Sequence, residues 1–133
     1  MINSDTVYKI VFLDIETSPN LAFVWGAWEQ DVIAFKTEWY LLSFSQKQPK
    51  GKTITYALPD FPLYKKEPEN DLELAKRLWD VLDGADLIVG HNIDKFDIRK
   101  MNTRFLVHGL PPPSPYKTCD TLKLSKHGPL RCY

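Results

Sequence analysis

Residues 8–17 read YKIVFLDIET, and this stretch decides the fold. The β-branched and aromatic run over 8–13 is of the kind that forms a buried central strand, which we expect to end at Asp14. If the extended conformation continues, the side chains of Asp14 and Glu16 lie on the same side of the sheet. Two carboxylates held close repel each other, and a bound divalent cation would remove that cost. A solvated strand end is the alternative interpretation, and the DxE pattern alone does not decide between them.

Two more strands are expected in the first half of the chain. They lie at 39–45 and 53–57, separated by the polar turn QKQPKGK, so that this part resembles an antiparallel meander. The sequence at 17–31, TSPNLAFVWGAWEQD, is punctuated by proline, asparagine and glycine and is too irregular for a helix. We interpret it as a connection in which Trp25 and Trp28 pack against the protein as anchors.

The second half of the chain alternates strand and helix. Apolar residues at helical spacing predict a helix that is capped by Asn70 or Asp71 and runs through Leu82, before a C-terminal cap at Gly84. The elements expected after it are a strand at 87–89, a helix to about 107 with Ile98, Met101, Phe105 and Leu106 as apolar positions, a strand at 116–119 and a helix starting at 120–121. This order implies an α/β sandwich with a mixed sheet, which is compatible with a ribonuclease H-like arrangement.

Composition sets limits on the partners and the setting of the protein. The chain has 133 residues, which we expect to form a single domain, and its 17 acidic and 17 basic side chains give a formal net charge of zero. There is therefore no global attraction to nucleic acid, and any such contact must be local. We see no membrane span and no secretion signal, so a cytoplasmic setting is expected, with Cys119 and Cys132 as free thiols.

A second candidate motif is LIVGHNIDKFD at 87–97, where Asp97 begins a helix directly after a buried strand and a loop. Alone it is weak evidence, because Asp94 or Asp97 can be a helix cap and Phe96 a core residue. Together with the strand that ends in DIET, it resembles the first and second motifs of the DEDD 3′→5′ exonuclease superfamily. The N-x-x-x-F-D pattern beginning at Asn92 is most similar to the exonuclease domain of family-B DNA polymerases and to related small phage and bacterial proteins.

The similarity extends over nearly the whole chain, through DIETSPNLAFVWG (14–26), FDIRKMNTRFLVHGL (96–110) and PPSPYKTCDTLKLSK (112–126). The resemblance implies a ribonuclease H-like α/β fold, with a mixed sheet flanked by helices. It also implies a soluble enzyme of a prokaryotic or phage-infected cell that removes nucleoside 5′-monophosphates from the 3′ ends of single-stranded DNA, with RNA as an open alternative.

The resemblance assigns Asp14, Glu16 and Asp97 to catalysis and to a two-metal site for Mg²⁺ or Mn²⁺, and it assigns Thr17 and Asn92 to nucleic-acid binding. A ribonuclease H-type endonuclease or transferase is a further alternative on the same fold, and the N-x-x-x-F-D pattern argues against it.

The third motif of that superfamily, Tyr-x-x-x-Asp or His-x-x-x-Asp, has no match here. Residues 121–133, TLKLSKHGPLRCY, contain no acidic residue, and we interpret Asp120 as a helix cap rather than a fourth ligand. We therefore expect a C-terminally truncated fold, a weakened second metal site and one uncovered face. The open alternatives are a natural truncation, a site completed by a second chain or copy, and a catalytically impaired relative with a nucleic-acid-binding or regulatory role.

Other residues near the motifs receive weaker interpretations. We interpret His91 as structural, because the superfamily places a histidine base in its third motif. The basic positions Lys95, Arg99, Lys100 and Arg104 can touch phosphates, although such a run on a helix is more often a solvated face.

Overall fold

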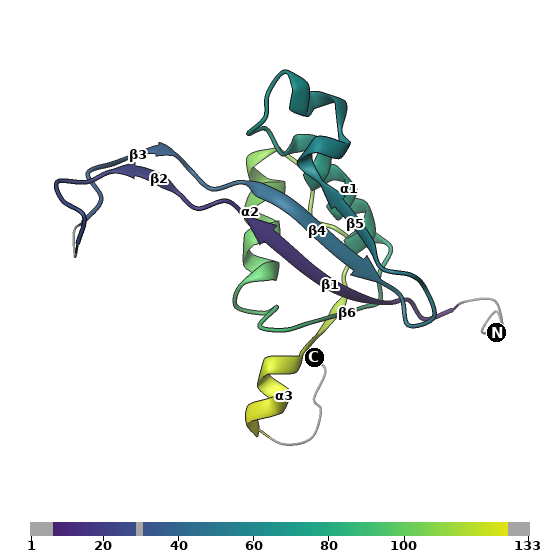
Figure 1. The fold of residues 1–133 in the computed structure, drawn as a ribbon. Coiled ribbons are helices and arrows are strands. Elements are labelled where there is room, and N and C mark those ends of the chain that lie inside the picture. The colour runs from purple at the N-terminus through teal and green to yellow at the C-terminus, as the bar shows by residue number, and fades with distance from the viewer. Residues whose placement is uncertain (1–6, 29–30, 128–133) are drawn as a thin grey trace.

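A computed structural model describes residues 7–28 and 31–127 and contains a five-stranded mixed sheet in the order β5-β4-β1-β6-β7 (Figure 1). The strands are β1 (Ile10–Thr17), β4 (Leu41–Lys47), β5 (Ile54–Ala57), β6 (Leu87–Gly90) and β7 (Lys117–Asp120). β1 is central, pairing antiparallel with β4 and parallel with β6. The antiparallel β1-β4-β5 meander and the later alternation of strand and helix confirm the expected fold class.

The alternation of side chains along β1 sets up the two faces of the sheet. Val11, Leu13 and Ile15 are buried, whereas Phe12, Asp14 and Glu16 are exposed. The expected end of this strand at Asp14 is wrong, because the ladder with β4 continues to Thr17 with an irregularity between Glu16 and Thr17. Asp14 and Glu16 are therefore both strand residues on one face.

Two helices, α1 (Leu72–Asp83) and α2 (Asp97–Val107), pack on the buried face of the sheet (Figure 1). Both form close to where helical spacing predicts them, and α1 ends at Gly84 as expected. Leu106 is an exception: it is 80% exposed, so its expected place among the packed positions of α2 is wrong. The remaining helical elements are η1 (Leu58–Asp60), η2 (Pro62–Lys65) and α3 (Thr121–His127).

The segment expected to be an irregular connection forms a two-stranded antiparallel hairpin, β2 (Leu21–Phe23) with β3 (Ala34–Thr37). We call it the arm, because it projects from the body of the domain (Figure 1). Trp25 and Trp28 are 86% and 84% exposed, so the expectation that they anchor the connection is wrong. Among the residues that the structure describes, no helix is layered on the two strands of the arm, so these side chains stay exposed.

Asp71 has a different role from the helix cap that was one of two expectations. Its side chain is fully buried and accepts hydrogen bonds from the Nε and Nη2 of Arg104 (2.7 and 2.6 Å), from the Nε2 of His108 (2.6 Å) and from the backbone N–H of Leu41 (2.8 Å). The other expected cap, Asn70, accepts the first N–H of α1 through its Oδ1. Asp71 thus ties α2 to the start of α1 and to β4.

The basic residues in and just before α2 differ in their surroundings. Arg104 is committed to Asp71 and to the carbonyl of Trp39, so it is not part of a solvated face. The Nζ of Lys100 lies 3.8 Å from the ring centroid of Trp39 and 5.7 Å from that of Phe96, which is a cation–π arrangement. Lys95 and Arg99 remain exposed.

No helix among the described residues combines the length and the apolar character that crossing a membrane requires. Cys119 is buried and forms no disulfide with another described residue, whereas Cys132 lies outside the described residues.

Candidate metal and nucleic-acid site

Two of the candidate carboxylates come from β1 and one comes from α2. Asp14 and Glu16 alternate with buried Leu13 and Ile15, so the pleat of the strand places both on the exposed face. Asp97 is the first residue of α2 and is only 4% exposed. Its Oδ2 accepts the backbone N–H of Ile15, the residue between Asp14 and Glu16, at 3.2 Å. One hydrogen bond thus joins residues that are 82 positions apart in the sequence.

The electrostatics of Asp97 reflect this placement. Burial raises its pKa to about 6, and the negative charges of Asp14 and Glu16 act in the same direction, whereas the N–H of Ile15 opposes the rise. A carboxylate that is both buried and close to like charges is destabilised in its ionised form. The three carboxylates therefore lie close enough to interact, and each is a hard oxygen donor of the kind that Mg²⁺ and Mn²⁺ accept.

The side chains do not form a closed ligand set as they stand. Within residues 7–28 and 31–127, no three His, Cys, Asp or Glu side chains converge as ligands of one ion. Asp14 and Glu16 extend into solvent, and rotamer changes on the exposed face would be needed to bring them together with Asp97. The donor chemistry and the shared location fit a divalent cation, although the coordination geometry is not preformed.

The loop between β6 and α2 carries Asn92 and His91. Asn92 has a φ of 57°, a left-handed conformation that asparagine tolerates better than most residues, and its N–H donates to Asp120. His91 Nδ1 lies 3.0 Å from the hydroxyl of Thr121, which is consistent with a structural role. Thr17 is half-buried at the end of β1.

Asp120 is a connector rather than a free ligand. Its carboxylate accepts the backbone N–H groups of Asn92 (2.9 Å), Asp94 (3.2 Å) and Leu122 (3.0 Å), and the last of these caps α3 as expected. Burial acts to raise the pKa of Asp120, yet these donors hold it below its ordinary value. The side chain thus fixes the loop that carries Asn92 to the start of α3.

The end of β6 approaches β1 closely at Gly90, just before the loop begins. A Cβ at this position would lie 2.7 Å from the Cδ1 of Ile93 and 2.9 Å from the carbonyl oxygen of Leu13, so only glycine fits. Beside this contact lies a cavity of about 390 Å³, whose lining includes Asp14, Phe12 and Gly90. Of the three candidate carboxylates, Asp14 therefore borders a hollow on the exposed face of the sheet.

Sequence reasoning missed two structural supports of the site. The Ser18 N–H donates to the carbonyl of Tyr40, and the Tyr40 N–H donates to the Ser18 hydroxyl, each at 2.9 Å. This pair closes the base of the arm directly after Thr17, the last residue of β1. The pairing of Asp71 with Arg104 on α2 was also missed, because the sequence offers Asp71 only as one of two possible helix caps.

The strand order, the parallel and antiparallel pairings and the helices on the sheet define a ribonuclease H-like α/β domain. Comparison with known proteins agrees with that class. The chain is similar in structure to the family B DNA polymerase from the hyperthermophilic archaeon Pyrobaculum calidifontis, with a TM-score of 0.63 and 14% sequence identity over 93% of this chain and 17% of the polymerase chain. At this identity the likeness shows the fold alone.

A sequence relative is Protein NEN3 of Arabidopsis thaliana, which is 40% identical over 52 residues, or 39% of this chain. The chain spans about 10% of that protein's length. No protein-family model matches the sequence.

Proposed function

We propose that this domain is a metal-dependent 3′→5′ exonuclease of the DEDD type, or the metal-binding part of one, acting on single-stranded DNA. The observation that carries the proposal is the hydrogen bond from the Ile15 N–H to Asp97, which brings Asp97 to the pair formed by Asp14 and Glu16. Residues of two sequence motifs, 82 positions apart, are thus in contact near the C-terminal end of the central strand β1.

Asp14, Glu16 and Asp97 would hold Mg²⁺ or Mn²⁺ in this function. Bound ions of this kind supply an activated water nucleophile and stabilise negative charge on the leaving oxygen. In the reaction, water adds to the last phosphodiester phosphorus, and the bond from that phosphorus to the 3′ oxygen breaks. The 3′ oxygen takes up a proton and becomes the new strand end, and a nucleoside 5′-monophosphate leaves. Thr17, which follows Glu16 in β1, and Asn92, in the loop between β6 and α2, would contact the substrate strand in this function.

The alternative is a catalytically impaired nuclease-fold protein with a nucleic-acid-binding or regulatory role. One observation favours it: Asp120, the carboxylate at the end of β7, is committed to three backbone N–H groups and is not offered as a fourth ligand. A second chain or copy that supplies a carboxylate would reconcile the exonuclease proposal with this observation.

Digestion of a 5′-labelled single-stranded oligonucleotide with Mg²⁺ or Mn²⁺ tests the proposal. We expect stepwise shortening from the 3′ end by the parent protein and none by Asp14→Ala or Asp97→Ala, because each variant lacks a metal ligand. Circular dichroism confirms that the variants are folded. Cleavage that persists in either variant would remove that residue from the mechanism, and no cleavage by a folded parent with either metal would favour the regulatory alternative.

A further inference from the structure

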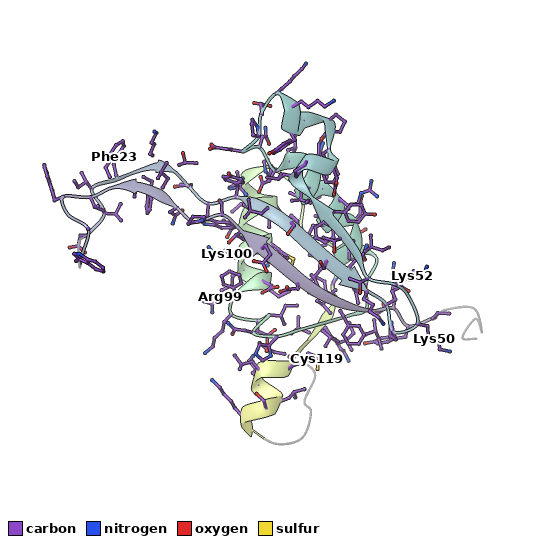
Figure 2. All side chains as sticks on the ribbon, in the orientation of Figure 1. Phe23, Lys50, Lys52, Arg99, Lys100 and Cys119 are labelled. Carbon is purple, nitrogen blue, oxygen red and sulfur yellow. The ribbon has the colours of Figure 1, made fainter. Side chains whose placement is uncertain are left out.

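A groove of about 840 Å³ lies at the end of the sheet where β1 begins. It is lined by residues 7–10, by the β4–β5 turn at 46–52 and by Ile54, and this lining contains no acidic side chain. The turn contributes Lys47, Lys50 and Lys52, and Figure 2 shows Lys50 and Lys52 at the tip of the meander. A local positive field thus exists in a chain whose formal net charge is zero.

The three lysines of the turn are available to an anion. Lys50 and Lys52 are exposed, and no ion pair found within residues 7–28 and 31–127 involves them. Lys47 donates only to the carbonyls of Gln48 and Pro49, so its charge is uncompensated. Lys9 also lines the groove but does not belong with these three. The side-chain Nζ of Lys9 lies beside Gly84, and the backbone N–H of Lys9 donates to the carboxylate of Asp86.

The groove is continuous with the candidate site. Gln46 and Lys47 line both the groove and the cavity that reaches Asp14. From Ile10 in the groove to Asp14 is four residues of β1, or roughly 13 Å at about 3.3 Å per residue. At about 3.4 Å per nucleotide, this corresponds to roughly four nucleotides of a stacked strand.

Two exposed aromatic rings lie on the same surface as the lysines. Tyr8 in the groove is 56% exposed and Phe12 beside the cavity is 42% exposed. The Nζ of Lys47 lies 5.9 Å from the Phe12 ring centroid, so charge and ring share one surface. Exposed rings and cations in one groove are the elements by which proteins bind single strands without sequence preference, through base stacking and phosphate contacts.

We propose that this lysine groove binds the single-stranded nucleic acid upstream of the 3′ end that the carboxylates engage. The inference rests on the proposed function, and it names a second substrate contact, roughly four nucleotides from the reacting bond. An acidic peptide would satisfy the lysines as well. The exposed rings and the direct path to Asp14 favour a nucleic-acid strand.

The test measures binding of the full chain to a labelled oligothymidylate of about twelve nucleotides. Fluorescence anisotropy is recorded in EDTA over a range of salt concentrations. Each lost phosphate contact should reduce the slope of log affinity against log salt by about 0.7, so Lys50→Gln/Lys52→Gln should lose about 1.4, equivalent to about twentyfold weaker binding near 0.1 M salt. Lys50→Arg/Lys52→Arg should bind like the parent, because the charge is kept.

The matched control is Lys65→Gln/Lys66→Gln, which removes the same charge from exposed positions at and next to η2, outside the groove. Binding that is unchanged in the Lys50 and Lys52 variant, or reduced equally in the control, would overturn the inference. Displacement of the oligonucleotide by polyglutamate at equal charge concentration would also overturn it, in favour of a protein partner. Failure of the proposed function gives a different result. If binding depends on the lysines but the parent shows no metal-dependent cleavage, the groove binds nucleic acid and the exonuclease proposal is wrong.

Discussion

Replacing Asp71 by Asn should destabilise the domain more than a typical surface substitution. Asp71 is fully buried and pairs with Arg104, whose side chain is 12% exposed. Removing one partner of a buried ion pair leaves the other charge uncompensated, which costs about 3 to 5 kcal/mol. We expect a loss near the lower value, about 3 kcal/mol, because Arg104 keeps some contact with water. Stability for a chain of this length is on the order of 7 to 20 kcal/mol, so the loss is a large part of it.

Urea unfolding at pH 7, followed by far-ultraviolet circular dichroism, measures this loss. With a slope of about 2 kcal/mol per molar, the midpoint should fall by about 1.5 M. Asp80→Asn, an exposed position on α1, is the matched control and should leave the midpoint nearly unchanged. The double variant Asp71→Asn/Arg104→Met should lose less than the sum of the single variants, because the uncompensated charge is gone. A loss below about 1 kcal/mol would refute the reasoning, since that is the value of an exposed pair.

The same carboxylate makes stability depend on pH. Burial acts to raise the pKa of Asp71, but hydrogen bonds from Arg104, Leu41 and His108 lower it below its ordinary value. A lowered folded-state pKa contributes stability above the unfolded value of about 3.9, and this contribution is lost as the pH falls through the folded pKa. The parent should therefore lose stability more steeply with acid than Asp71→Asn does. Parallel pH profiles of the urea midpoint would contradict this assignment.

Three more substitutions probe the candidate site. Asp97→Asn should raise the free energy of unfolding at pH 8 without metal by about 1 to 3 kcal/mol, because a carboxylate whose pKa is raised to about 6 is destabilised when ionised. Calorimetry should show that this variant no longer binds Mn²⁺. A variant less stable than the parent would contradict the account. Asn92→Ala should cost about 1 kcal/mol of stability, because the backbone at this position has a φ of 57°, whereas Asn92→Gly should not. If the side-chain amide of Asn92 contacts DNA, anisotropy will show that the glycine variant binds DNA more weakly than the parent. Equal affinity would leave Asn92 a purely conformational role. Gly90→Ala should lower the free energy of unfolding by about 1 to 3 kcal/mol in the same urea assay, because the added Cβ would meet Ile93 and the Leu13 carbonyl. An unchanged midpoint would show that the neighbouring backbone relaxes easily.

The sequence predicted the fold wherever a periodic pattern met a buried surface. The run at 8–13, the apolar spacing of α1 and the short strand at 87–89 each reflect burial, so pattern and structure agree. The sequence predicts the end of β1 too early, because the charged residues Asp14 and Glu16 are typical of a strand end. Charges on the exposed face of a strand do not interrupt its backbone pairing, which here continues to Thr17.

The arm and the Asp71 network were missed for a different reason. Trp25 and Trp28 looked buried because large apolar side chains usually are, and no local pattern shows that a hairpin has nothing to pack on. Asp71 has the same local signature as a helix cap, and its partners lie 30 to 37 positions away. The candidate carboxylates were picked out by motif resemblance, and their contact through Ile15 required the three-dimensional structure.

The paired hydrogen bonds between Ser18 and Tyr40 have a consequence for motion. The arm contributes little buried apolar surface, so its amide groups should exchange with solvent by local opening at low free energy, whereas those of β1 should exchange only when the whole domain unfolds. The Ser18 and Tyr40 bonds lie at the boundary between these two regimes. We therefore expect bending of the arm to end at these two bonds, before it reaches Glu16, so that β1 keeps its register with β4 beneath the candidate site.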